Sequence, residues 1–265
     1  MVAKNSLKEM AQTRKARFGT FLVEFNTPGI GHIMKAAGCE YVLLDMEHSG
    51  FNFESLKSML QYMQAADLPT IVRVPSRNYN HIARALDMGA EGLMLPMVAS
   101  GEEAAQIAAH AKYPMQGHRG IALQVAHDNY KPGPVMKKLR DANKRSTVFA
   151  QIETPEGVEN AFDIAAVKGI DCLWVGHFDL SASMGIPGQF DHPDFIAAVK
   201  RVESACRKHK KSLGRLVPDV ETGVAVYRDG FDFICYSGDV WIFQAALKDG
   251  LDQLRAKCKG GRGKR

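Results

Sequence analysis

Short apolar runs alternate with amphipathic segments along most of the chain. The first four apolar runs occupy residues 18–25, 41–45, 70–74 and 92–96. Each is followed by a segment with the apolar period of about 3.6 residues that is typical of a helix, and these segments end near residues 37, 65, 88 and 111. The alternation returns with apolar runs at residues 147–152, 172–175, 212–216 and 233–237 and helical segments at 157–167, 193–209, 220–229 and 240–256. The pattern predicts eight strands that each precede a helix.

Eight strand–helix units in 265 residues predict a single-domain TIM (β/α)8 barrel. A doubly wound open sheet is the alternative, but no GxGxxG turn follows any of the apolar runs. We assign residues 1–256 to the barrel domain and residues 257–265 to a basic, disordered tail. Residues 112–146 form a long excursion rich in Gly, Pro, His and Arg, which is typical of a functional or disordered loop.

The positive charge of the chain is concentrated at its carboxyl terminus. Residues 255–265 contain six Lys or Arg and no acid, so removing those six from the formal net charge of +5 leaves −1. The charge therefore does not indicate a nucleic-acid-binding face. Five widely spaced cysteines without a CxxC motif predict reduced thiols and neither a disulfide framework nor a zinc site. A polar amino terminus and the lack of a run of about 18 apolar residues predict a soluble, cytoplasmic protein without a membrane partner.

Polar side chains gather where the predicted strands end. In a TIM barrel the active site lies at the carboxyl ends of the strands, so these side chains are the candidates for chemistry. They are Glu24, Asp45, Glu47, His48, Arg73, Gln151, Glu153, His177, Asp179, Ser237 and Asp239. Lysine does not follow any predicted strand, so a Schiff-base mechanism lacks its nucleophile.

Two carboxylates follow the fifth and sixth strands. Side chains alternate along a strand, so Gln151 and Glu153 share one face, and parallel neighbours bring Glu153 close to Asp179. Carboxylates without a nearby Cys or His suit a hard divalent cation such as Mg or Mn. The alternative interpretation is that Glu153 and Asp179 cap the helices that follow them.

Asp45 and His48 leave the second strand together, and Arg73 ends the third. An Asp that accepts the Nδ1–H of a His fixes the tautomer and leaves Nε2 free as a general base. The alternative is a surface His beside a helix start. Arg73 suits a carboxylate or a developing enolate oxygen, and a salt bridge with Glu47 or Glu153 is an equally good interpretation.

Several motifs at these strand ends occur together in one known family. They are Asp45-Met-Glu-His48, Val72-Arg73, Leu95-Pro-Met97, Tyr113-Pro114, Gly117-His-Arg-Gly120, Gln151-Ile-Glu-Thr154, Gly176-His-Phe-Asp-Leu-Ser181 and Met184-Gly185. In these motifs, and from Gly19 to about Leu247, the chain resembles the metal-dependent (class II) pyruvate aldolases of the HpcH/HpaI family. Its best known members cleave 4-hydroxy-2-oxoheptanedioate.

The resemblance implies a role for each of these side chains. Glu153 and Asp179 would bind a divalent metal (Mg, Mn or Co) that chelates pyruvate, and no organic cofactor is expected. His48, oriented by Asp45, would be the general base acting through water, and Arg73 would stabilise the enolate. The expected substrate-binding residues are Arg73, Glu47, Gln151, Phe178 and Leu216. The implied activity is that of an aldehyde-lyase that reversibly cleaves a 4-hydroxy-2-oxoacid to pyruvate and an aldehyde.

The chain also departs from the family pattern. His177 and Phe178 stand where the family commonly has Pro-Ala or Pro-Ser, and Glu24 lies outside the pattern. Three alternative functions remain: a CoA-thioester lyase of the citrate or malyl type, an oxaloacetate decarboxylase, and a barrel without catalytic activity. The family resemblance further implies a homo-oligomer, expected to be a hexamer of dimers that exchange their last helices.

Overall fold

The computed structural model describes residues 6–259 and forms a closed barrel of eight parallel strands in sequential order. The strands are β1 (Arg17–Leu22), β2 (Tyr41–Asp45), β3 (Thr70–Arg73), β4 (Gly92–Leu95), β5 (Thr147–Ile152), β6 (Cys172–Val175), β7 (Ser212–Val217) and β8 (Phe233–Gly238). β8 pairs with β1 and closes the barrel. The prediction of a TIM barrel is confirmed.

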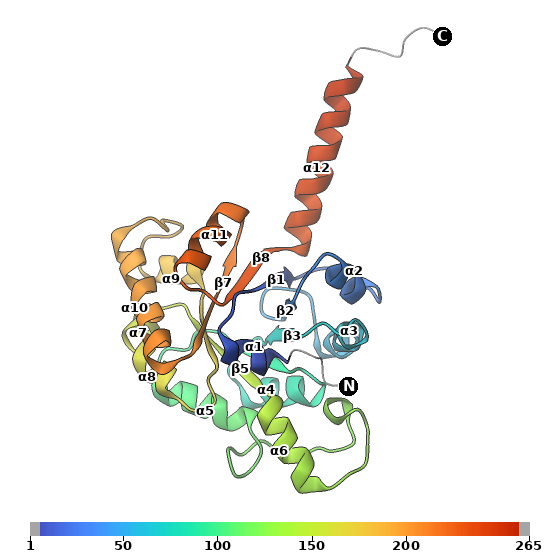
Figure 1. Cartoon of the computed structure of the whole chain (residues 1–265), viewed down its shortest axis with the longest axis vertical. Helices are drawn as coiled ribbons and strands as arrows, with labels where there is room; N and C mark the ends of the chain where they lie inside the picture. Colours follow the sequence, from blue (N-terminus) through green and yellow to red (C-terminus); the bar gives the residue numbers. More distant parts are fainter. Residues whose placement is uncertain (1–5, 260–265) are drawn as a thin grey trace.

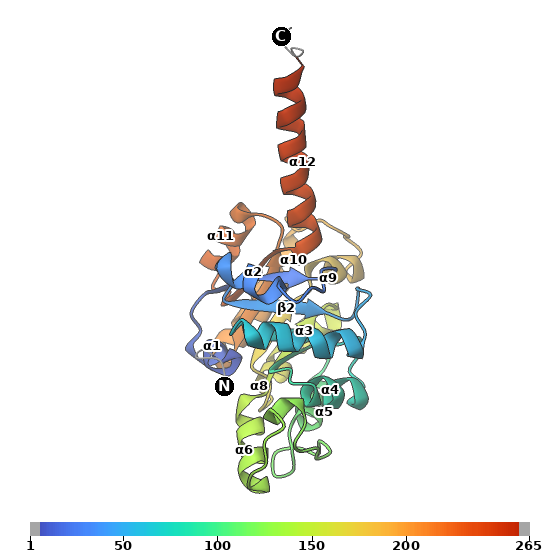
Figure 2. The same cartoon turned by 90° about the vertical axis from the view of Figure 1, so that its right-hand side faces the viewer.

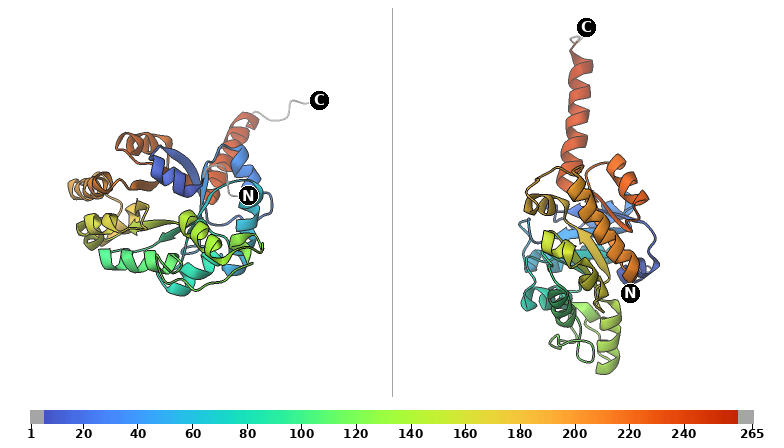
Figure 3. Two further views of the ribbon diagram at one scale, coloured as in Figure 1. Left: turned by 60° about the horizontal axis from the view of Figure 1, so that its bottom comes forward. Right: turned by 90° about the vertical axis from the view of Figure 1, so that its left-hand side faces the viewer.

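Helices surround the strands, as Figure 3 shows. Those that follow strands β1 to β5 are α2 (Ile30–Ala36), α3 (Phe53–Ala65), α4 (Tyr79–Asp87), α5 (Gly101–Ala111), and α7 (Pro155–Glu159) with α8 (Ala161–Ala166). Those that follow β6 to β8 are α9 (His177–Ser183) with α10 (Pro193–His209), α11 (Val220–Arg228), and α12 (Asp239–Cys258). The predicted helix 157–167 is thus two short helices that meet at Asn160. No helix among residues 6–259 combines the length and apolar character that a membrane span requires.

The long excursion between α5 and β5 is largely structured. It contains a 3-10 turn (Ala126–Asp128) and the helix α6 (Val135–Arg145), neither of which the sequence pattern predicted. Lys112, at the start of the excursion, is buried and donates to the backbone oxygens of Asn143 and Ser146. These bonds fasten the end of α5 to the junction between α6 and β5.

The first strand ends earlier than predicted. β1 stops at Leu22, whereas the apolar run continues to Phe25. The backbone N–H groups of Val23, Glu24 and Phe25 donate to the carboxylate of Asp239 instead of to a neighbouring strand. Asp239 therefore joins the end of β1 to the start of α12.

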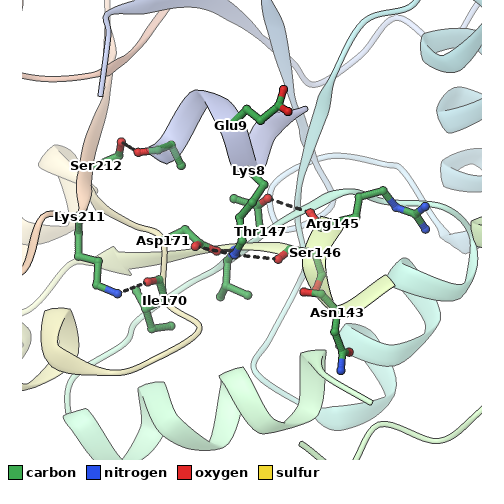
Figure 4. Close-up of polar contacts among 12 residues, drawn as sticks. Lys8, Glu9, Asn143, Arg145, Ser146, Thr147, Ile170, Asp171, Lys211 and Ser212 are labelled. Carbon is green, nitrogen blue, oxygen red and sulfur yellow. Dashed lines mark hydrogen bonds and ion pairs between the residues drawn. The ribbon is translucent and has the colours of Figure 1, made fainter. Parts of the chain in front are cut away.

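The amino-terminal end of the barrel is closed by a helix that the sequence pattern also did not predict, α1 (Leu7–Thr13). Leu7, Met10 and Ala11 are buried and pack with the inward-facing side chains of the barrel. Figure 4 shows Lys8 reaching Asp171, at 2.6 Å, and the backbone oxygen of Ser146. Apolar side chains of α1 and the contacts of Lys8 with Asp171 and Ser146 therefore close this end of the barrel.

The last helix leaves the barrel. In Figures 1 and 2, α12 extends away from the strands and only its first turns lie against them. Its side chains are almost all exposed, including Phe243, Leu247 and Leu254. The helix continues to Cys258, and residues 260–265 lie outside the described residues, so the boundary of the barrel at residue 256 and the disordered tail stay predictions. All five cysteines lie within the described residues and are free thiols.

Candidate active site

A cavity of about 370 Å³ opens at the carboxyl ends of the strands. Its polar lining residues are Asp45, His48, Arg73, Gln151 and Asp179. Its apolar lining includes Phe21, Met94, Trp174, Phe178, Leu216 and Trp241, and the Arg73 guanidinium lies 5.2 Å above the ring of Phe21. Seven of the nine sequence-predicted site residues thus line the cavity, together with His177, whereas Glu47 and Glu153 do not line it. Because inward-facing side chains of all parallel strands meet at this end, residues far apart in the sequence converge here.

Arg73 is held by a bidentate ion pair with Asp45. Asp45 and Arg73 are partners in the pairing of β2 with β3. Arg73 Nε donates to Asp45 Oδ1 at 2.7 Å and Nη2 donates to Oδ2 at 2.8 Å, and both side chains are buried. Glu47 Oε2 lies 3.3 Å from Arg73 Nη1. Burial opposes the charge of Arg73, but the hydrogen bond and charge of Asp45 and the charge of Glu47 raise its pKa on balance.

The predicted salt bridge between Arg73 and Glu47 is therefore present, and Asp45 is a stronger partner that the sequence did not indicate. Asp45 also accepts the backbone N–H groups of Glu47, at 3.0 Å, and of His48, at 3.2 Å. It positions His48 through the backbone, whereas the sequence analysis expected a bond to the imidazole. The His48 ring is 64% exposed, and its closest carboxylate contact is Glu47, with 3.9 Å between Nε2 and Oε2.

Glu153 is buried next to Gly176 of the cavity lining and does not cap a helix. Its Oε1 accepts from Gln151 Nε2 at 2.8 Å, and its Oε2 accepts from the backbone N–H of Met97 at 2.7 Å. The cap of α7 is Thr154, whose hydroxyl accepts from the N–H of Gly157. The helix-cap interpretation is therefore wrong for Glu153.

Asp179 lies in the first turn of α9, and the N-cap of that helix is Gly176, which makes no side-chain cap bond. Gly176 has room for hydrogen only, because a Cβ there would lie 2.5 Å from Glu153 Cγ and 2.7 Å from Glu153 Oε1. The glycine thus allows the backbone between β6 and α9 to pass directly over the Glu153 carboxylate. This close approach brings Asp179 and Glu153 to the same side of the cavity.

The surroundings of Glu153 disfavour its negative charge. Burial, and the charges of Asp179 and Glu47, raise the pKa of Glu153 to about 7, although the N–H of Met97 acts in the opposite direction. Burial likewise raises the pKa of Glu47. Two buried oxygens, Glu47 Oε2 and Gln151 Oε1, make no hydrogen bond. Carboxylate and amide oxygens without donors are suited to a hard divalent cation.

The residues present fit such a cation as a partial ligand set. Within residues 6–259 no three His, Cys, Asp or Glu side chains are grouped closely enough for a complete protein-made metal site. Glu153 and Asp179 would therefore supply two oxygen ligands, and water or substrate would supply the others, as is common for Mg. The metal, its identity and the ligand roles stay predictions.

Two of the departures from the family pattern, His177 and Phe178, line the cavity. His177 is buried, and burial followed by the charge of Arg215 lowers its pKa to about 3. Its ring lies 4.5 Å from that of Phe178 and 5.0 Å from that of Phe190, measured between centroids. Glu24, Ser237 and Asp239 do not line the cavity, and Asp239 instead binds the backbone after β1.

The sequence analysis missed Trp174 and Trp241 as cavity residues. Trp174 lies in β6 one position after Leu173, and the alternation along the strand could have identified it as inward-facing. Trp241 comes from the first turn of α12 and reaches the cavity because Asp239 fixes that turn against β1. No local pattern indicated this contact.

The chain is similar to known proteins along most of its length. The family model described as HpcH/HpaI aldolase/citrate lyase matches residues 17–245. A hydroxypyruvate/pyruvate aldolase of Paraburkholderia phytofirmans is 34% identical over 95% of this chain and 98% of its own length. A 5-keto-4-deoxy-D-glucarate aldolase of Shigella boydii is 31% identical over 95% of this chain and 96% of its own. The crystal structure of an HpcH/HpaI aldolase from Desulfitobacterium hafniense has a TM-score of 0.89 and 30% identity, and covers 94% of this chain and 96% of that one.

Proposed function

The chain belongs to the HpcH/HpaI aldolase/citrate lyase family and is an enzyme of the aldolase type, and we propose that it reversibly cleaves a 4-hydroxy-2-oxoacid to pyruvate and an aldehyde. The observation that carries this proposal is that the fixed guanidinium of Arg73 and the carboxylate of Asp179 line one cavity, with the carboxylate of Glu153 directly behind Gly176 of its lining. Pyruvate offers a carboxylate and a keto oxygen, which suit a cation held by Glu153 and Asp179 and the N–H donors of Arg73.

In this proposal Glu153 and Asp179 hold a divalent cation, Mg, Mn or Co. When bound, such an ion would polarise the C2 carbonyl of the ketoacid and favour the enolate. Gln151 Oε1 and Glu47 Oε2, which have no hydrogen-bond partner, would accept from water or substrate hydroxyls. No organic cofactor is required by this chemistry.

Arg73 would stabilise the negative charge that develops on the C2 oxygen. A guanidinium has five N–H donors, and the pair with Asp45 uses one on Nε and one on Nη2. The structure shows no hydrogen bond from Nη1 to any described residue, and the donors on Nη1 would be available to a substrate oxygen. Because Asp45 already fixes the guanidinium plane, little reorganisation is needed as charge develops.

His48 would serve as the general base at the rim. In the cleavage direction it takes the proton of the C4 hydroxyl, through water, and the C3–C4 bond breaks. The aldehyde leaves, the electron pair passes to the C2 oxygen beside Arg73, and protonation at C3 gives pyruvate. In the addition direction the same base removes a proton from the pyruvate methyl group.

Deuterium exchange of the pyruvate methyl group in heavy water, followed by NMR, tests this half-reaction without an aldehyde. We expect exchange that requires added Mn or Mg, stops with EDTA and is lost in Glu153→Ala and Arg73→Ala. Asp141→Ala, which removes an exposed carboxylate of α6, is the matched control and keeps the exchange. Pyruvate that binds but does not exchange with any metal would overturn the proposal and favour a thioester lyase or a barrel without catalysis.

A further inference from the structure

The apolar wall of the cavity stands next to the groups proposed to bind pyruvate. Phe178 directly precedes Asp179, and Leu216, Trp174 and Trp241 continue the wall across β7, β6 and α12. Phe178 is 61% exposed and Trp241 is 46% exposed. Exposed aromatic side chains that line a concave site are typical of a ligand-binding surface.

Phe178 is held in place despite its exposure. Its ring centroid lies 5.3 Å from that of Phe190 and 4.5 Å from that of His177, and Phe190 in turn lies 5.5 Å from Phe195. Phe195 is fully buried at the start of α10. The aromatic contacts thus connect the exposed ring to the core, so the wall has a defined shape before a ligand binds.

The wall offers no free positive charge. Of the described residues that line the cavity, Arg73 is the only Lys or Arg; it is paired with Asp45, and its remaining donors are those proposed above for the ketoacid half of the substrate. Arg215 precedes Leu216 on β7 but does not line the cavity, because its guanidinium lies behind the wall, 5.7 Å above the ring of Phe190. A carboxylate or phosphate at the far end of an aldehyde would therefore lose water here without gaining a partner.

We propose that the aldehyde half of the substrate is uncharged and apolar, and that Phe178 and Leu216 determine this specificity. The inference rests on the proposed aldolase function, because it assigns the part of the cavity that the ketoacid does not fill. It differs from what the name of a 5-keto-4-deoxy-D-glucarate aldolase implies for that relative, whose substrate is a polar acid.

Two aldehydes of the same shape test the inference. 4-Methylpentanal and 4-oxobutanoate share a skeleton, and two methyl groups of the first replace the two carboxylate oxygens of the second. We would measure kcat/KM for addition of pyruvate to each aldehyde, with Mn present, by NMR of the aldol product. We expect 4-methylpentanal to be preferred by about tenfold or more.

A variant with a cation in the wall supplies the second measurement. Phe178→Lys is expected to lower the preference for 4-methylpentanal by about tenfold or more, because the ammonium can pair with the carboxylate. Tyr227→Lys adds the same charge at an exposed aromatic position of α11 outside the cavity, and it is expected to leave the preference unchanged. The preference is a ratio within one sample, so a smaller folded fraction does not alter it.

The outcomes separate the two proposals. If the wild-type chain exchanges the pyruvate methyl protons but uses 4-oxobutanoate as well as or better than 4-methylpentanal, the acceptor inference is wrong and the aldolase proposal stands. If Tyr227→Lys changes the preference as much as Phe178→Lys does, the wall does not determine specificity. Failure of exchange in the wild-type chain overturns the aldolase proposal and the acceptor inference together.

Discussion

Glu153 carries the least compensated charge of the proposed site. Burial and the nearby carboxylates Asp179 and Glu47 raise its pKa to about 7, so the protonated form dominates below that pH. A cation must displace this proton. We therefore expect the affinity for Mn²⁺ to rise with pH, by up to about tenfold per unit below about pH 7, and to level off above it.

Titration of the metal-free protein with Mn²⁺ at several pH values, by calorimetry or EPR, measures this dependence. Glu153→Gln keeps the shape of the side chain but has no proton to release, so its weaker affinity should vary much less with pH. An affinity of the wild-type chain that stays constant from about pH 5.5 to about pH 8 would contradict the assignment of Glu153 as a ligand.

Lys112 is a second buried ionisable residue, and it does not line the cavity. Its Nζ donates to the backbone oxygens of Asn143 and Ser146 and to Ser146 Oγ at 2.6–2.7 Å, which favours the ammonium form. Burial opposes the charge and is the larger effect, and the pKa falls to about 7. Between about pH 7 and the ordinary value of 10.5 the unfolded chain binds a proton that the folded chain has released.

The contribution of Lys112 to the free energy of unfolding should therefore become more favourable as the pH rises from about 7 to about 10.5, and should stay constant below about pH 7. We expect the wild-type chain to gain about 1–2 kcal/mol relative to Lys112→Met between about pH 7 and about pH 9. Urea unfolding at these two pH values measures the difference. Lys144→Met, which removes a lysine from α6 next to Asn143, is the control. An equal pH dependence of stability in the wild-type chain and in Lys112→Met would refute the expectation.

At the scale of elements, the eight strands and most helices could be predicted because each has an apolar run or a clear period. The short elements could not. α9 spans seven residues, too few for a period, and follows β6 with only Gly176 between them. α1 was missed although Ser6 and Glu9 form a capping box, a local signal that could have identified it.

The candidate site shows the same division. The strand ends identified the polar residues, because parallel strands bring their carboxyl ends together. Their hydrogen-bond partners depend on the register between strands: Asp45 pairs with Arg73 because the two are opposite each other on β2 and β3. A sequence without that register suggested the nearer His48, and it could not place Trp241 beside the cavity.

A substitution in α1 tests whether the amino-terminal end of the barrel contributes to stability but not to pyruvate exchange. Leu7 is fully buried beneath the strands, so Leu7→Ala should lower the free energy of unfolding by about 3 kcal/mol through lost contacts and a cavity. Pyruvate exchange by the folded protein should be retained, because the site is at the opposite end. Urea unfolding and the exchange assay measure the two effects, and Val135→Ala at a half-exposed position of α6 is the control. Loss of exchange without loss of stability would contradict this separation.

At the scale of the whole molecule, α12 is the element that the barrel leaves uncovered. Phe243, Leu247, Leu251 and Leu254 are exposed and recur at helical spacing, so they form one apolar stripe. A hollow of about 610 Å³ lies beside the first turns of the helix and is lined by Phe25, Ile33, Ile242 and other apolar residues. Apolar surface of this extent is typical of an interface between chains.

We therefore expect a homo-oligomer, with a hexamer as the state that the family resemblance implies. Light scattering after size exclusion should give a mass of several times 29.2 kDa, and six times that value for a hexamer. Combining Leu247→Glu with Leu254→Glu places two charges on the stripe and should shift the mass toward the single chain, because a buried carboxylate without a partner is costly. Lys248→Glu changes the charge at a neighbouring position that pairs with Asp252 and should leave the mass unchanged. A wild-type chain that stays at 29.2 kDa at micromolar concentration would show that the stripe is not an interface.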